Sequence, residues 1–330
     1  MQLISYPKEN VEIPLNFYDD LKKQTAEEIK WAKIVASNIQ PDSTEANPSV
    51  SWTSHHSKEN RDKSDKCHTI NSSLPLIDHL SHDINFQSHI MKIAMDYTNF
   101  LNPGQRTIGC SDCPLYAIKK KLQWSNPNVF PSGQYLPFMG GLHIEQLFLK
   151  INGQLTKGTG MDAIIGKAGL EYIGLETAFT DVNDIKKARY SIQVEVACLY
   201  KMLEAAHLAS GVALDLMTWA EQQTGSMFRY WFQVMLFQLN ILSFVRSLRE
   251  SDMKLFLSSL KAAVPMCFAL DRMHYARWLS VFIRDLEILS VEDKALFDRL
   301  GEHLSVRSTD SEFSKVAYDQ RHEQNNKMII

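Results

Sequence analysis

Carboxylate and imidazole side chains occur at three separated places in this 330-residue sequence where they could take part in catalysis. Asp112 follows a short apolar run, and His143 and Glu145 follow the next such run after two glycines. Asp319 and Glu323 are four residues apart near the C-terminus, so a helix there would place both carboxylates on one face. Like charges at this spacing repel each other unless a cation or another partner offsets them.

These side-chain types suit hard divalent cations such as Mg²⁺, which prefer carboxylate oxygens. Two-metal phosphoryl transfer needs acidic ligands that converge from separate elements, and acids at two strand ends and on a late helix would supply them. The ordinary alternative stays open, because acids at strand ends are often solvated and the polar face of a helix is usually its wet face.

The elements that must position these residues alternate in type along the middle of the chain. Short strands are predicted at 105–110, "QRTIGC", and at 135–141, "YLPFMGG". Helices are predicted at 115–124, "LYAIKKKLQW", and at 144–151, "IEQLFLKI". This strand–helix–strand–helix order is typical of an α/β layer.

The chain becomes almost entirely helical after Gly153. Residues 226–250 repeat apolar side chains every three or four positions, which predicts a long amphipathic helix with a wide buried stripe. Pro265 is expected to interrupt the next helix, Ser290 with Asp293 resembles a capping box, and "HLSVRS" is a further strand candidate.

Composition limits the classes of function. The formal net charge is -3 and 45% of the residues are hydrophobic, so no whole-protein attraction draws the chain to nucleic acid or membranes. The N-terminus lacks a secretory signal, and the longest apolar run, 231–245, is too short to span a bilayer. An intracellular protein, nuclear or cytoplasmic, is expected.

Several common catalytic motifs are missing from the sequence. The segment 157–169, "KGTGMDAIIGKAG", lacks the first glycine and the hydroxyl residue of a Walker loop, and no G-x-S-x-G occurs. Cys110 and Cys113 form a single C-x2-C, which supplies only half of a zinc site. His55 and His56 lie in a polar segment and are expected to be solvated.

Five regions are predicted along the chain. They are an N-terminal segment at 1–40, a polar mobile segment at 41–74, one part of an α/β core at 75–154, a helical region at 155–300, and a C-terminal strand and helix at 301–330 that complete the core.

Four longer motifs carry a family resemblance, and they are "SDCPLYAIKKKLQW", "GGLHIE", "VPMCFALDRMHYARWLSVFIRDLEIL" and "FSKVAYDQRHEQNN". From about Ser51 to Asn326 the chain resembles a large family of metazoan proteins that occurs as many near-copies in cnidarian and other invertebrate genomes. Such copies look transposon-derived and are similar to cut-and-paste transposases with a ribonuclease-H-like core.

The resemblance implies an acidic triad that binds two Mg²⁺ ions and cleaves or transfers DNA strands. It implies Asp112 as the first acid, His143 or Glu145 as the second ligand, and Glu323 or neighbouring Asp319 as the third. The helical region 155–300 would then be an insertion between the second and third ligands. DNA is the implied partner.

Departures from the family pattern predict a truncated or inactive copy. Cys113 stands where the family usually has glutamine, and the chain stops at Ile330, soon after the last motif. The alternative is a non-enzymatic helical protein that binds proteins or nucleic acid. Two basic runs would suit nucleic acid in a transposase and would be solvated faces otherwise; their cations are Lys119, Lys120, Lys121, Lys186, Lys187 and Arg189.

Overall fold

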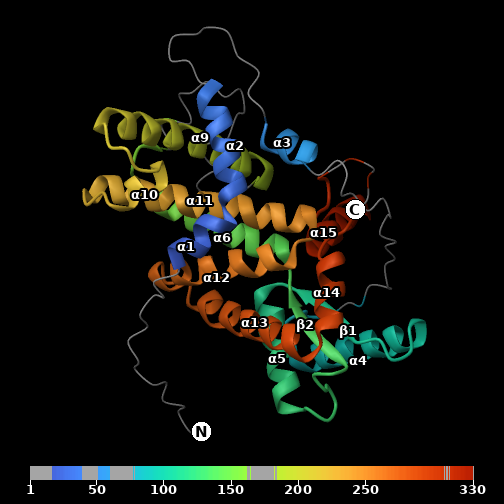
Figure 1. Ribbon diagram of the computed structural model, residues 1–330. Helices are drawn as coiled ribbons and strands as arrows, with labels where there is room; N and C mark the ends of the chain where they lie inside the picture. Colours follow the sequence, from blue (N-terminus) through green and yellow to red (C-terminus); the bar gives the residue numbers. More distant parts are fainter. Residues whose placement is uncertain are drawn as a thin grey trace.

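The fold is helix-rich, with one small parallel sheet in the part of the chain that is described (Figure 1). The computed structural model describes residues 17–38, 51–59, 77, 79–161, 164, 182, 184–307, 309, 311 and 313–329, with side chains from residue 21 to residue 324. The coarse prediction, a helix-rich α/β protein, is confirmed. A ribonuclease-H-like topology remains a prediction.

The sheet consists of two parallel strands joined by a helix. β1, Thr107–Ser111, pairs in register with β2, Tyr135–Met139, and α5, Cys113–Ser125, connects them. α6, Gly141–Thr156, begins directly after β2. The predicted strand–helix–strand–helix order is therefore confirmed, and it brings Asp112 and His143 to the same end of the sheet, because parallel strands end at one edge.

Apolar side chains cover both faces of this sheet. Tyr135 packs with Leu122 of α5 and with Met91 of α4, Ile84–Leu101, in a small separate cluster. On the other face, the ring of Phe138 lies 5.0 Å from that of Phe282. Phe282 belongs to α13, Met273–Glu292. Coverage of both faces is usual for parallel strands.

α11, Ser226–Glu250, is the central helix of the remaining, all-helical part (Figure 1). Every residue from Val234 to Leu248 is buried. The sequence predicts a wide buried stripe on one side of this helix. In the structure the buried surface extends around the whole helix over these residues, because other elements surround α11. The helices around it and at the ends of the chain are α1 Phe17–Gln24, α2 Ala26–Asn38, α9 Ile185–Ser210, α10 Leu216–Glu221, α12 Met253–Ala269, α14 Lys294–Glu302 and α15 Tyr318–Ile329.

One large apolar core crosses the predicted region boundaries. Leu21 and Trp31 from the N-terminal helices, Phe148 from α6, Phe244 from α11 and Ala317 before α15 belong to the same cluster of buried residues. α6 was assigned to the α/β part, yet it packs against α11 and α9. The predicted breaks at 154/155 and 300/301 therefore do not correspond to breaks in the packing.

The prediction of a polar mobile segment at 41–74 was wrong for part of its length. Trp52–Glu59 form helix α3, in which Trp52, His55 and His56 are buried. The sequence shows no apolar helical pattern here, because the buried side of α3 consists of two histidines and one tryptophan rather than aliphatic residues. The other positions of 41–74, except Ser51, lie outside the described residues.

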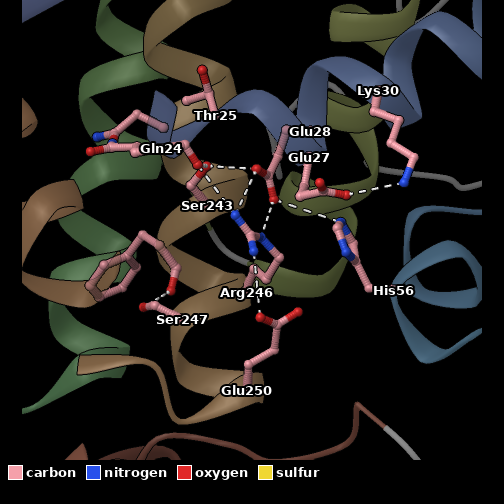
Figure 2. Close-up of polar contacts among 12 residues, drawn as sticks. Gln24, Thr25, Glu27, Glu28, Lys30, His56, Ser243, Arg246, Ser247 and Glu250 are labelled. Carbon is pink, nitrogen blue, oxygen red and sulfur yellow. Dashed lines mark hydrogen bonds and ion pairs between the residues drawn. The ribbon is translucent and has the colours of Figure 1, made fainter. Parts of the chain in front are cut away.

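A buried ionic network ties these N-terminal helices to α11 (Figure 2). Glu28 of α2 is fully buried and accepts hydrogen bonds from Arg246 Nε at 2.7 Å and from Ser243 Oγ at 2.9 Å. His56 Nε2 lies 3.6 Å from Glu28 Oε1. Burial lowers the pKa of His56 to about 3, so this imidazole is neutral near pH 7.

Local predictions near the C-terminal half needed three corrections. α12 runs through Pro265, which lies in its last turns, where one missing N–H removes only one helix hydrogen bond. Asp293 alone caps α14 through Leu296 N–H, while the Ser290 hydroxyl donates to Glu287 O. The strand candidate "HLSVRS" forms only an isolated antiparallel bridge, between Val306 and Val316.

Candidate functional site

The site lies where the start of α6 meets the start of α15. Asp319 of α15 caps α6, because Leu142 N–H donates to Asp319 Oδ1 at 3.0 Å and His143 N–H donates to Oδ2 at 3.2 Å. A Cβ on Gly140 would come within 2.1 Å of Asp319 Oδ2, and one on Gly141 within 3.0 Å of Ala317 Cβ. The two glycines of "GGLHIE" therefore allow the two helices to approach.

His143 is held between two carboxylates of α15. Its Nδ1 lies 2.9 Å from Asp319 Oδ2, and its Nε2 lies 3.7 Å from Glu323 Oε1. The hydrogen bond with Asp319 is the main reason that the pKa of His143 is raised. Burial opposes this rise, and the negative charges of Asp319, Glu323 and Asp112 add to it.

Asp112 lies at the end of β1 and caps α5, with Leu115 N–H donating to its Oδ1 at 2.9 Å. The negative charge of Asp112 acts to raise the pKa of His143 and that of the buried Lys119. Burial lowers the pKa of Lys119, while the charges of Cys110 and Asp112 act in the opposite direction. The sequence predicts a surface position for Lys119, whereas its side chain is buried.

The predicted residues Asp112, His143, Asp319 and Glu323 thus gather at one end of the sheet, although they come from three separate parts of the chain. Glu145 does not join them. Its side chain is 1% exposed and accepts hydrogen bonds from both Nε and Nη2 of Arg189. Two residues along a helix turn a side chain through about 200°, so His143 and Glu145 point to different sides of α6. The ligand role predicted for Glu145 is corrected to a buried ion pair.

The predicted nucleic-acid contacts are also corrected at three positions. Lys119 and Lys120 are buried, and Lys120 Nζ lies 2.7 Å from Asp285 Oδ2. Arg189 is committed to Glu145. The sequence showed only a run of cations, and the helical twist of α5 turns two of its three lysines inward.

Three of the predicted cations keep some exposure to solvent. Lys121 and Lys186 are exposed, and Lys187 is half-buried with an interaction of its own. The Nζ of Lys121 lies 5.9 Å from the ring centroid of Trp278, so this cation contacts an aromatic face rather than extending freely.

The side chains of this site do not form a ready ligand set for Mg²⁺. Among the described residues, no group of three or more His, Cys, Asp or Glu side chains is placed to hold a metal ion. Both oxygens of Asp319 accept backbone N–H groups, one oxygen of Asp112 does the same, and Glu145 is neutralised by Arg189. The expected two-metal triad therefore does not fit the donors as they stand.

A buried acid between α9 and α11, Glu195, is not among the residues that the sequence predicts for a site. Glu195 is 2% exposed, and burial raises its pKa to about 8, with Gln238 opposing that shift. Gln238 Nε2 donates to Asn152 Oδ1 at 3.1 Å, while its own Oε1 is buried without a donor in the part of the chain that is described. The available signal was a polar residue at a core position of an apolar helix stripe.

Comparisons with known proteins add one match. Residues 175–329 match a family described as a domain of unknown function, DUF8702. No curated protein and no solved structure matches the chain. No helix within the described ranges has the length and apolar character needed to cross a membrane.

Proposed function

We propose that this chain is a transposase-derived protein with a ribonuclease-H-type core remnant, and that its site acts on DNA phosphodiester bonds. One observation carries the proposal: His143 contacts Asp319 and Glu323, residues about 180 positions away in the sequence, at the sheet end that also holds Asp112. Acidic and imidazole side chains that converge from separate elements at the carboxyl ends of parallel strands favour a functional site.

The geometry assigns His143 a proton-transfer role in this proposal. Asp319 holds Nδ1 and fixes the orientation of the ring, as a carboxylate does for a catalytic histidine. Nε2 is then the atom that can accept a proton from a water attacking phosphorus and later release it. The described side chains do not form a ligand set for Mg²⁺, so a requirement for this ion is tested by adding it to the assay.

Nicking of supercoiled plasmid tests this function, with and without millimolar Mg²⁺ or Mn²⁺. We expect His143→Ala to abolish nicking, and Asp319→Asn to lower its rate by about 10- to 100-fold because the ring loses its orienting carboxylate. His89→Ala, at an exposed histidine on α4, is the matched control and should nick like the wild type. Nicking that survives in His143→Ala, or an inactive wild type under all these conditions, would contradict the proposal.

A titration of His143 by NMR gives a second readout that does not depend on activity. Asp319→Asn should lower the pKa of His143, because the hydrogen bond with Asp319 is the main cause of its raised value. Glu323→Gln should lower it less, since Glu323 lies farther from the ring. An unchanged pKa in Asp319→Asn would show that the pair does not act as a unit.

The second candidate is a non-enzymatic protein that binds other proteins or nucleic acid. It is favoured by the use of Asp112 and Asp319 as helix caps and of Glu145 as an ion-pair partner, which are structural roles. Under this reading His143→Ala changes stability alone. Binding of a labelled DNA duplex without nicking by the wild type would select it.

A further inference from the structure

β1 has one edge that is not used by the sheet. Thr107 N–H donates to Gln134 O at 2.8 Å, and Ser111 O accepts from Gly140 N–H at 2.8 Å. Peptide groups alternate in direction along a strand, so those of Thr107, Gly109 and Ser111 point toward β2. The N–H and C=O groups of Ile108 and Cys110 must therefore point to the opposite edge.

No hydrogen bond among the described residues uses these outward peptide groups. Among the described residues the sheet order is β1–β2 alone, so no described strand pairs with the outer side of β1. Parallel sheets normally contain more strands and are covered throughout, and an unpaired edge is a template for another strand. Ile108 is 40% exposed, so solvent reaches this residue of β1.

A groove of about 420 Å³ borders this edge, between the end of α4, β1 and α14. Its apolar lining comes from both strands and from the α14 region, and its cations are Arg106 and Arg299. None of its lining residues is acidic. The Nε of Arg106 is buried without a hydrogen-bond partner among the described residues, and the carboxylates that act on its charge, those of Asp293, Glu292 and Asp285, lie outside the groove lining.

We propose that the outer edge of β1 binds an extended acidic segment of another protein, which adds to the sheet as a third strand. Its backbone would pair with Ile108 and Cys110, its alternate apolar side chains would lie on the groove, and a carboxylate would accept from Arg106 and reach Arg299. A second copy of this chain fits poorly, because the same groove would bring more cations and no carboxylate. The general mode is strand addition at a sheet edge.

Hydrogen exchange measured by NMR on the full chain tests this placement. The probe is a pool of acetylated eight-residue peptides that alternate valine or isoleucine with glutamate. At saturation, exchange of the Ile108 and Cys110 amides should slow at least tenfold, while the Gly109 amide, already bonded to β2, should not change. The same pool with alternate backbone nitrogens methylated should bind at least tenfold more weakly, because it cannot complete the ladder.

Charge reversal tests the acidic character of the partner. Arg299→Glu should weaken binding of the glutamate pool by about tenfold and favour a matching lysine pool, while Arg277→Glu, an exposed arginine on α13 outside the groove, should leave both affinities unchanged. Equal binding of the methylated pool, or no protection at millimolar peptide, would overturn the proposal. Protection of Ile108 and Cys110 that grows with protein concentration alone would assign the edge to a second copy and would also overturn it.

Discussion

Burial decides what each glutamate of this protein can do. Glu323 is partly exposed beside His143, whereas Glu145 is enclosed and its charge is balanced by Arg189. Glu195 is enclosed and no cation among the described residues offsets its burial, so it is mostly protonated near pH 7.

Replacement of Glu195 by glutamine should therefore remove a pH dependence of stability. Burial raises the folded-state pKa of Glu195 from 4.5 to about 8, so the stability that its protonation supports is complete below about pH 4.5 and is lost as the pH rises through 8. At pH 9, Glu195→Gln should raise the free energy of unfolding by about 2–5 kcal/mol. Below pH 4.5 the variant and the wild type should unfold alike.

Urea unfolding between pH 4 and pH 9 measures this difference. Glu302→Gln, at an exposed glutamate on α14, is the matched control and should follow the wild type at every pH. If Glu195→Gln were less stable than the wild type at pH 9, Glu195 would have to be charged and paired in the folded protein.

At the scale of elements, the approach of α15 to α6 depends on the glycine pair between β2 and α6. Asp319 replaces the side-chain cap that Gly140 cannot provide, and it does so from a helix that begins at Tyr318. The same carboxylate also holds His143. The Asp319 carboxylate therefore caps α6, joins α15 to α6 and orients His143, so a change in one of these contacts alters the others.

Gly140→Ala should separate the two helices. The new Cβ would lie 2.1 Å from Asp319 Oδ2, so Asp319 must move and both N–H groups of α6 lose their acceptor. We expect a loss of about 1–3 kcal/mol in the free energy of unfolding. The pKa of His143 should fall in the same variant, because its hydrogen bond with Asp319 is broken.

Gly133→Ala is the matched control for this substitution, since a Cβ there meets nothing within 4 Å. Chemical denaturation gives the stability change, and the NMR titration of His143 gives the local effect. If Gly140→Ala were destabilised but His143 kept the raised pKa of the wild type, Asp319 would have moved together with His143. The predicted link between the Gly140 contact and the pKa of His143 would then be wrong.

At the scale of the molecule, the N-terminal helices are part of one core with α11. Glu28 contributes from α2, Arg246 from α11 and His56 from α3, so three distant segments meet at one buried charge pair (Figure 2). Arg246 Nη1 also lies 3.4 Å from Glu250 Oε2. Burial raises the pKa of Glu28 even though Arg246 acts to lower it. The pair therefore specifies how these segments dock, and its halves depend on each other.

Arg246→Met should destabilise the whole molecule, because it leaves Glu28 buried without its cation. At pH 8 we expect a loss of about 3–5 kcal/mol, and a smaller loss near pH 5, where protonation of Glu28 removes the uncompensated charge. The double variant Arg246→Met with Glu28→Met should recover most of the stability. If single and double variants unfold alike at both pH values, the pair is not a unit.

Local sequence patterns are enough to predict five of the helices and strands and several of their ends. Hydrophobic periodicity predicted β1, α5, β2, α6 and α11, and the residues Asp112 and His143 were placed correctly after their strands. These features follow from neighbours within a few residues, since helix and strand periods and helix caps are local. The convergence of His143 with Asp319 and Glu323 agreed with the predicted candidate set, although spacing alone could not place α15 there.

Which charges face water and which face each other depends on the packing of the elements and not on local sequence patterns. Glu145 meets Arg189 and Lys120 meets Asp285 across long stretches of sequence, and neither pair is visible as a local pattern. His56 of α3 is buried because its ring stacks on that of Phe313 and lies beside Glu28 of α2, not because its own segment is apolar. The partner and the burial of a charged side chain depend on how the helices and strands pack together. That packing results from many contacts between residues that are distant in the sequence.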